Sequence, residues 1–133
     1  MPVITVQPDL DEIAGMSQKL RTMLQGSATP TKLVHGIVLI AEELLANSVN
    51  HGRVAKETVV QIVIETEKNG IIFTYCDCGI PFDIVRASAD AIAEPETGKV
   101  GGLGLVMIRE LSDSATYRYH DGKNETRIRF AYP

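Results

Sequence analysis

Apolar residues recur along this chain at two spacings, and each spacing predicts one kind of element. Steps of three and four residues predict amphipathic helices, whereas strict alternation of apolar and polar residues predicts half-buried strands. Helices are expected at residues 8–26, 31–51, 83–91 and 103–111. Strands are expected at residues 3–7, 58–67, 71–77, 115–119 and 126–132.

The order of these elements predicts the fold class. Asn69-Gly70 is a tight-hairpin sequence because both residues tolerate positive φ, and Asp121-Gly122 predicts a second turn. The helices are too few and too unevenly spaced for a doubly wound sheet with helices on both faces. We therefore expect an α+β two-layer sandwich, with a mixed, mostly antiparallel sheet covered by helices on one face. The length of 133 residues suits one domain, expected to span residues 1–133.

Composition and charge narrow the functional classes. The net charge of -4 argues against direct nucleic-acid binding, which needs a basic patch for the phosphates. No apolar run reaches the roughly 18 residues of a membrane span, and the N-terminus lacks a basic region followed by an apolar one, so neither a membrane nor a signal peptide is expected. The two cysteines, Cys76 and Cys78, are interpreted as reduced packing residues of a cytoplasmic protein.

Polar side chains lie along one flank of the helix expected at residues 31–51. Glu43, Asn47 and His51 recur at steps of four, so they stack beside its apolar face. A carboxylate, a carboxamide and an imidazole are costly to bury there unless each finds a partner. The alternative is an ordinary solvated edge with an Asn near the helix end.

A second polar group ends the strand expected at residues 71–77. Asp77 shares a face with the apolar Phe73, so its carboxylate needs a hydrogen-bond donor, and the exocyclic amine of a purine would be one. Gly79 permits close backbone approach and Pro81 stiffens the turn. The alternative is a surface Asp-x-Gly turn.

Glycines gather before the helix expected at residues 103–111. Free backbone N–H groups at such a helix start can bind an anion, and Lys99 can add a point charge. The stretch lacks the Gly-Lys-Ser/Thr of a P-loop, and no strand precedes it as in a Rossmann fingerprint. Residues 93–102 are interpreted as a mobile loop, and the alternative is a plain flexible linker.

Taken together, the three stretches resemble the gyrase/histidine-kinase type of ATP-binding domain, the Bergerat fold. Glu43-x-x-x-Asn47 resembles its N box, Asp77-x-Gly79-x-Pro81-Phe82 its first glycine box, and residues 101–105 its second. His51-Gly52 and the run at residues 101–113 are similar to the anti-sigma-factor serine/threonine kinases. A sensor histidine kinase would need a phosphoacceptor histidine before the central helix, and that segment contains none.

The resemblance implies ATP and Mg²⁺ as cofactors and assigns roles to individual residues. Asn47 would ligate Mg²⁺ with phosphate oxygens, and Glu43 would be the catalytic general base toward an incoming hydroxyl. Asp77 would accept the adenine amine, and Thr126 would assist through a water. The implied ATP-binding residues are Asn47, His51, Asp77, Gly79, Pro81, Phe82, Lys99, Gly101, Gly102, Leu103, Gly104, Leu105 and Thr126.

The resemblance also implies a function and partners. It predicts a cytoplasmic, ATP-dependent serine/threonine protein kinase that acts as an anti-sigma regulatory factor. Such a protein phosphorylates an anti-sigma-factor antagonist and sequesters a sigma factor, and homodimers are common in that family. Pro81 departs from the glycine that the superfamily often carries there. The alternative function is a nucleotide-dependent binding switch without phosphotransfer.

Overall fold

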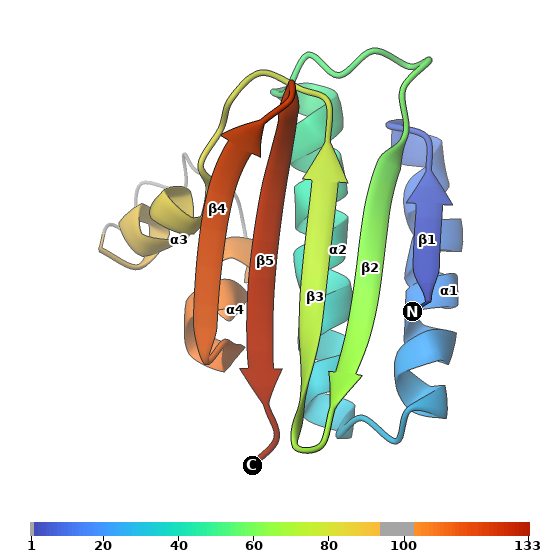
Figure 1. The fold of residues 1–133 in the computed structure, drawn as a ribbon, viewed down its shortest axis with the longest axis vertical. Helices are drawn as coiled ribbons and strands as arrows, with labels where there is room; N and C mark the ends of the chain where they lie inside the picture. The colour runs from blue at the N-terminus through green and yellow to red at the C-terminus, as the bar shows by residue number, and fades with distance from the viewer. Residues whose placement is uncertain (1, 94–102) are drawn as a thin grey trace.

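The computed structural model describes residues 2–93 and 103–133. Within them, helices cover one face of a five-stranded sheet, and the helix at residues 84–93 lies beside one edge of that sheet (Figure 1). The strands are β1 (Val3–Val6), β2 (Val60–Glu67), β3 (Gly70–Asp77), β4 (Ser114–His120) and β5 (Lys123–Ala131). The helices are η1 (Leu10–Glu12), α1 (Ile13–Gly26), α2 (Thr31–Asn50), α3 (Ile84–Ala93) and α4 (Leu103–Leu111).

The sheet order is β1-β2-β3-β5-β4, which confirms the α+β two-layer sandwich. Every pairing among the described strands is antiparallel, so the expected parallel component of a mixed sheet is wrong for these strands. The reason is the pair of helices between β1 and β2. Helix α1 takes the chain away and α2 returns it to the end where β1 finished, so β2 runs in the opposite direction (Figure 1).

Helix α2 lies behind the middle of the sheet and forms the centre of the core (Figure 1). Its Ile37, Ile40 and Leu45 are fully buried, as are Ile62 and Phe73 on the inward face of the sheet. Within the described residues, α2 is the one helix with the length and hydropathy of a membrane span. The buried apolar side chains account for that hydropathy, because a central core helix needs them on several sides.

Two sequence details need correction. The hairpin between β2 and β3 exists, but Glu67 pairs with Gly70, so the turn is Lys68–Asn69 and neither Asn69 nor Gly70 has a positive φ. Gly70 instead belongs to β3, where a Cβ would lie 2.6 Å from the backbone oxygen of Phe130. The packing interpretation fails for the second cysteine, because Cys78 is exposed at the strand end.

Candidate functional site

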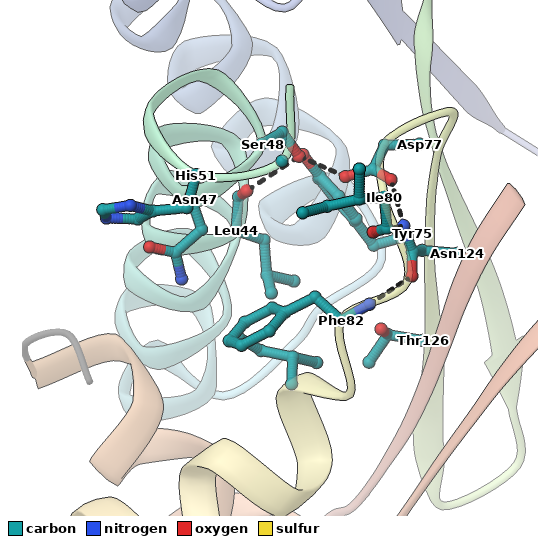
Figure 2. Close-up of a pocket in the computed structure, with 12 residues that line it drawn as sticks. Leu44, Asn47, Ser48, His51, Tyr75, Asp77, Ile80, Phe82, Asn124 and Thr126 are labelled. Carbon is teal, nitrogen blue, oxygen red and sulfur yellow. Dashed lines mark hydrogen bonds between the residues drawn. The ribbon is translucent and has the colours of Figure 1, made fainter. Parts of the chain in front are cut away.

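A cavity of about 70 Å³ lies where the end of α2 meets the end of β3 and the start of β5 (Figure 2). Its walls come from three parts of the chain that are far apart in sequence. The last two turns of α2 form one side, the segment after β3 forms another, and β5 closes the third. The lining residues are Leu44, Asn47, Ser48, His51, Gly52, Tyr75, Asp77, Ile80, Phe82, Ile84, Asn124 and Thr126.

Asp77 is the buried carboxylate of this cavity, with 8% of its surface exposed. Its Oδ1 accepts hydrogen bonds from the Gly79 N–H at 3.0 Å and from Nδ2 of Asn124 at 2.9 Å. Among the described residues, its Oδ2 accepts one hydrogen bond, from the Ser48 hydroxyl at 2.5 Å. A carboxylate oxygen has about two acceptor positions, so Oδ2 retains one for a further donor.

Ser48 and Tyr75 form a relay of hydroxyl groups behind Asp77. The Ser48 Oγ lies 2.6 Å from the Tyr75 hydroxyl and 3.1 Å from the Leu44 carbonyl oxygen (Figure 2). Desolvation by burial raises the pKa of Tyr75 well above its usual range, so its phenol stays protonated. Ser48 donates its single hydroxyl hydrogen to Asp77 Oδ2, so Tyr75 is the donor to the Ser48 oxygen. This direction of donation stabilises the ionised carboxylate in an apolar surrounding.

Helix α2 presents two of the expected side chains to the cavity. Asn47 is half-buried and His51 is exposed, and Figure 2 shows them on the same flank of the helix. Glu43 lies one turn earlier and is half-buried, but it does not line this cavity. The three residues therefore follow one another along α2 as expected, but only Asn47 and His51 line the cavity.

The turn after β3 packs directly on the end of α2. The Ile80 N–H donates to the Gly52 carbonyl oxygen at 2.8 Å. A Cβ at Gly79 would lie 2.6 Å from that same oxygen, which is too close for any side chain. Gly79 is therefore required for contact between protein segments. Pro81 is exposed in this turn, and the half-exposed Phe82 lines the cavity.

Helix α4 packs against α2 beside Glu43. A Cβ at Gly104 would lie 2.5 Å from the Glu43 Cβ and 3.0 Å from the Leu39 carbonyl oxygen. Glycine thus allows the start of α4 to approach α2. Leu105 is fully buried in the core and Leu103 is 58% exposed, so neither side chain lines the cavity. The remaining expected phosphate-binding residues, Lys99, Gly101 and Gly102, lie outside the described residues, as does most of the expected loop.

Three polar residues of the cavity were missed by the sequence reasoning. Ser48 falls in the apolar stripe of its helix, and Tyr75 falls among the apolar neighbours of Asp77, so neither position indicates a polar role. Asn124 precedes Thr126, the expected start of the last strand. A signal for Asn124 existed, because the alternation of inward residues in β5 extends back to it.

The oxygen and nitrogen donors at the cavity fit Mg²⁺ only as part of a shared set of ligands. The described residues contain no cluster of three or more His, Cys, Asp or Glu side chains placed to hold a metal ion. Mg²⁺ commonly keeps several waters and uses one or two protein oxygens together with substrate phosphates. The carboxamide oxygen of Asn47 at the cavity wall fits this pattern, in which one protein oxygen joins phosphate oxygens and waters around the ion.

The fold and the cavity define an α+β ligand-binding domain whose buried carboxylate faces a small, largely apolar cavity. The family model for the histidine kinase-like ATPase domain matches residues 6–130. The chain therefore belongs to the histidine kinase-like ATPase domain family, which confirms the superfamily expected from the three stretches. A comparison with curated proteins gives no match.

Solved structures share this fold at low sequence identity. The structure of the RsbU and RsbW domains of Rv1364c from Mycobacterium tuberculosis matches with a TM-score of 0.64 and 16% identity. The match covers 98% of this chain and 32% of that one, so this chain spans about a third of its length. The SiaB-SiaC complex from Pseudomonas aeruginosa matches with a TM-score of 0.60 and 17% identity, covering 98% of this chain and 89% of that one.

Proposed function

We propose that this protein is an ATP-dependent serine/threonine protein kinase that acts as an anti-sigma regulatory factor. The observation that carries the proposal is that Asp77 and Asn47 line the same cavity, from two sides, in a histidine kinase-like ATPase domain (Figure 2). The likeness of the fold to a chain containing an RsbW domain supports the anti-sigma branch.

The cavity suits the base of a nucleotide. Its volume of about 70 Å³ is small beside the roughly 300–1,000 Å³ of ordinary ligand pockets, so we assign it to the base end of the ligand and not to a whole nucleotide. Leu44, Ile80 and Phe82 supply apolar wall, and the open position on Asp77 Oδ2 accepts the adenine amino group. Thr126, which is 3% exposed, lies on β5 opposite Tyr75 and is proposed to hold a water at the ring.

The phosphate end of the proposed site lies along α2 at Asn47 and Glu43. Asn47 holds Mg²⁺ together with phosphate oxygens, and Glu43, one turn away, accepts the proton of the incoming hydroxyl. Lys99 and the backbone of residues 101–105 hold the phosphates, with help from the dipole of α4. ATP supplies the phosphoryl group, so the chain's contribution is positioning and charge neutralisation.

The proposed partners follow from the family resemblance. The hydroxyl that receives phosphate belongs to a serine or threonine of an anti-sigma-factor antagonist, and the second partner is a sigma factor. A homodimer and a cytoplasmic location belong to the same proposal. The likeness to a chain in a structure of the SiaB-SiaC complex supports a protein partner.

Calorimetric titration of ATP, with and without Mg²⁺, tests the nucleotide site. We expect Mg²⁺-dependent binding that Asn47→Ala weakens by roughly tenfold or more, since it removes a metal ligand. Asn50→Ala is the matched control, because Asn50 is an exposed residue at the end of the same helix. A folded wild type that binds no ATP would remove the proposal.

A second function is favoured by the position of Glu43. Because Glu43 packs beneath Gly104, it also serves the contact between α2 and α4. In that case the protein is a nucleotide-dependent switch that captures a partner without transferring phosphate. Glu43→Gln separates the two functions in an assay with labelled ATP and the antagonist. A kinase loses transfer and keeps ATP binding, whereas full transfer by the variant rules out Glu43 as the base.

A further inference from the structure

Asn124 links three separate segments around Asp77. It stands directly opposite Asp77 in the pairing of β3 with β5, and only 7% of its surface is exposed. Its side chain contacts the end of β3 and the turn at residues 78–83 (Figure 2). Through Tyr117 it also contacts the edge strand β4. The proposed function gives Asn124 no role.

All four hydrogen-bonding positions of the Asn124 amide are used. Its Nδ2 donates to Asp77 Oδ1 at 2.9 Å and to the Ile80 carbonyl oxygen at 2.8 Å. Its Oδ1 accepts from the Phe82 N–H at 2.9 Å and from the Tyr117 hydroxyl. An amide side chain offers two donors and two acceptor positions, so Asn124 is saturated. Its orientation is fixed, because the two acceptors lie on one side and the two donors on the other.

These contacts belong to a set that satisfies three backbone N–H groups of the turn. The Gly79 N–H is held by Asp77, the Ile80 N–H by Gly52, and the Phe82 N–H by Asn124. Pro81 has no N–H, so its position needs no acceptor. The proline is therefore compatible with this turn. Asn124 holds the segment on both sides of it, at the Ile80 carbonyl oxygen and the Phe82 N–H.

We propose that Asn124, oriented by Tyr117, is a positioning residue that sets the base selectivity of the cavity. It occupies Asp77 Oδ1 together with the Gly79 N–H, which leaves Oδ2 as the oxygen that faces a ligand. It also fixes the positions of Ile80 and Phe82 relative to the purine ring. The ligand is a purine nucleotide with an exocyclic amino group as donor, and this inference rests on the proposed function.

The test compares ATP with purine riboside triphosphate, which lacks the 6-amino group, by calorimetric titration. The wild type should prefer ATP by roughly tenfold, the value of one good hydrogen bond to a charged acceptor. In Asn124→Ala the affinity for ATP falls about tenfold while that for the deamino analogue falls less, so the preference nearly disappears. Tyr117→Phe should lower the preference about threefold, since the Phe82 N–H still holds the amide.

Two controls separate positioning from loss of stability. Glu125→Gln alters the neighbouring residue on the outward face of β5 and should leave both affinities unchanged. Leu24→Ala truncates a fully buried side chain of α1 and should lower the Tm while keeping the preference for ATP.

Equal loss of both nucleotides in Asn124→Ala, with the preference kept, would overturn the inference alone. A wild type that binds neither nucleotide would remove the proposed function, and the inference with it. If Asn124→Ala does not fold, Tyr117→Phe decides, because an unchanged preference in that variant contradicts the proposed orientation of the amide.

Discussion

The two faces of strand β5 both carry polar side chains, but they use them in opposite ways. The inward face has Asn124 and Thr126, which are buried at the cavity. The outward face has Glu125, Arg127 and Arg129, which form ion pairs on the side of the sheet away from the helices. These pairs join Arg118 to Glu125 at 2.7 Å, Arg127 to Glu65 at 3.7 Å, and Arg129 to Glu67 at 2.9 Å and Asp113 at 2.8 Å.

The difference lies in what replaces a lost partner. On the outward face, water takes the place of either member of an ion pair, so exposed pairs contribute little. On the inward face, the removal of one group leaves another buried donor or acceptor unsatisfied, which costs about 1–3 kcal/mol. The few inward polar groups should therefore control both stability and binding, while the many outward charges should control neither.

Asp77→Asn should have the largest effect. The substitution places an amide where a carboxylate receives three donors, so Ser48, Gly79 and Asn124 cannot all be satisfied. We expect ATP affinity to fall more than tenfold and the free energy of unfolding to fall by about 1–3 kcal/mol. Calorimetric titration and urea unfolding measure the two effects.

Asp113→Asn is the outward control for that change. It removes the same charge from a half-exposed residue that pairs with Arg129. Both ATP affinity and the urea midpoint should stay near the wild-type values, because surface substitutions usually remain within about 0.5 kcal/mol. Equal losses of ATP affinity in the two variants would show that total charge, rather than the buried network, governs binding.

Ser48→Ala should have the next largest effect. It leaves the Tyr75 hydroxyl and Asp77 Oδ2 without their shared partner, at a cost of about 1–3 kcal/mol. Tyr75→Phe should cost less, because Ser48 still donates to Asp77. In a double-mutant cycle by urea unfolding, the two losses should fall short of adding by about 0.5 kcal/mol or more. Additive losses would mean that the three groups do not act as a relay.

The raised pKa of Tyr75 predicts a dependence on alkaline pH. The pKa in the folded protein lies above the unfolded value of about 10, so the unfolded chain loses this proton first. The stability from the neutral phenol is therefore complete below about pH 10. Above it, this stability is lost at up to about 1.4 kcal/mol per pH unit.

The measurement is urea unfolding between pH 9 and pH 11 for the wild type, Tyr75→Phe and Tyr119→Phe. The Tyr75→Phe variant should show a shallower decline than the wild type, because the titrating group is gone. Tyr119 is 43% exposed on the edge strand β4, so its variant should follow the wild type. Identical declines for all three proteins would contradict the role of the buried phenol.

The sequence predicted elements well where the signal is local. Helix α4 spans Leu103–Leu111 as expected, and the inward position of Asp77 followed from its alternation with Phe73. The prediction of an Asn-Gly turn in the first hairpin was wrong. Lys68 and Asn69 close this hairpin, and neither has the positive φ that an Asn-Gly pair suggests.

The candidate site was predicted in outline, and its hydrogen-bond network was not. Asn47, His51, Asp77, Phe82 and Thr126 line one cavity, and their part in ATP binding stays a prediction. The role of Asn124 depends on partners more than forty residues earlier in the chain, and local periodicity carries no information on such contacts. Ser48 was missed for the same reason, since a serine fits the small positions of an apolar stripe.

The outward pair of Arg118 and Glu125 should give the smallest effect. A hydrogen bond from Arg118, together with its charge, lowers the pKa of Glu125, and His120 adds to the shift when it is protonated. Because the folded pKa is depressed, the pair's contribution is complete above the unfolded pKa of about 4.3 and is lost as pH falls through the folded value. Glu125→Gln lacks this contribution, so its urea midpoint should be slightly lower than the wild type's at pH 7 and equal to it near pH 3. The difference at pH 7 should also shrink in 1 M salt, because exposed charges are screened there. A loss at pH 7 as large as that of Ser48→Ala would remove the division between the two faces of β5, since it would give an exposed pair the weight of a buried one.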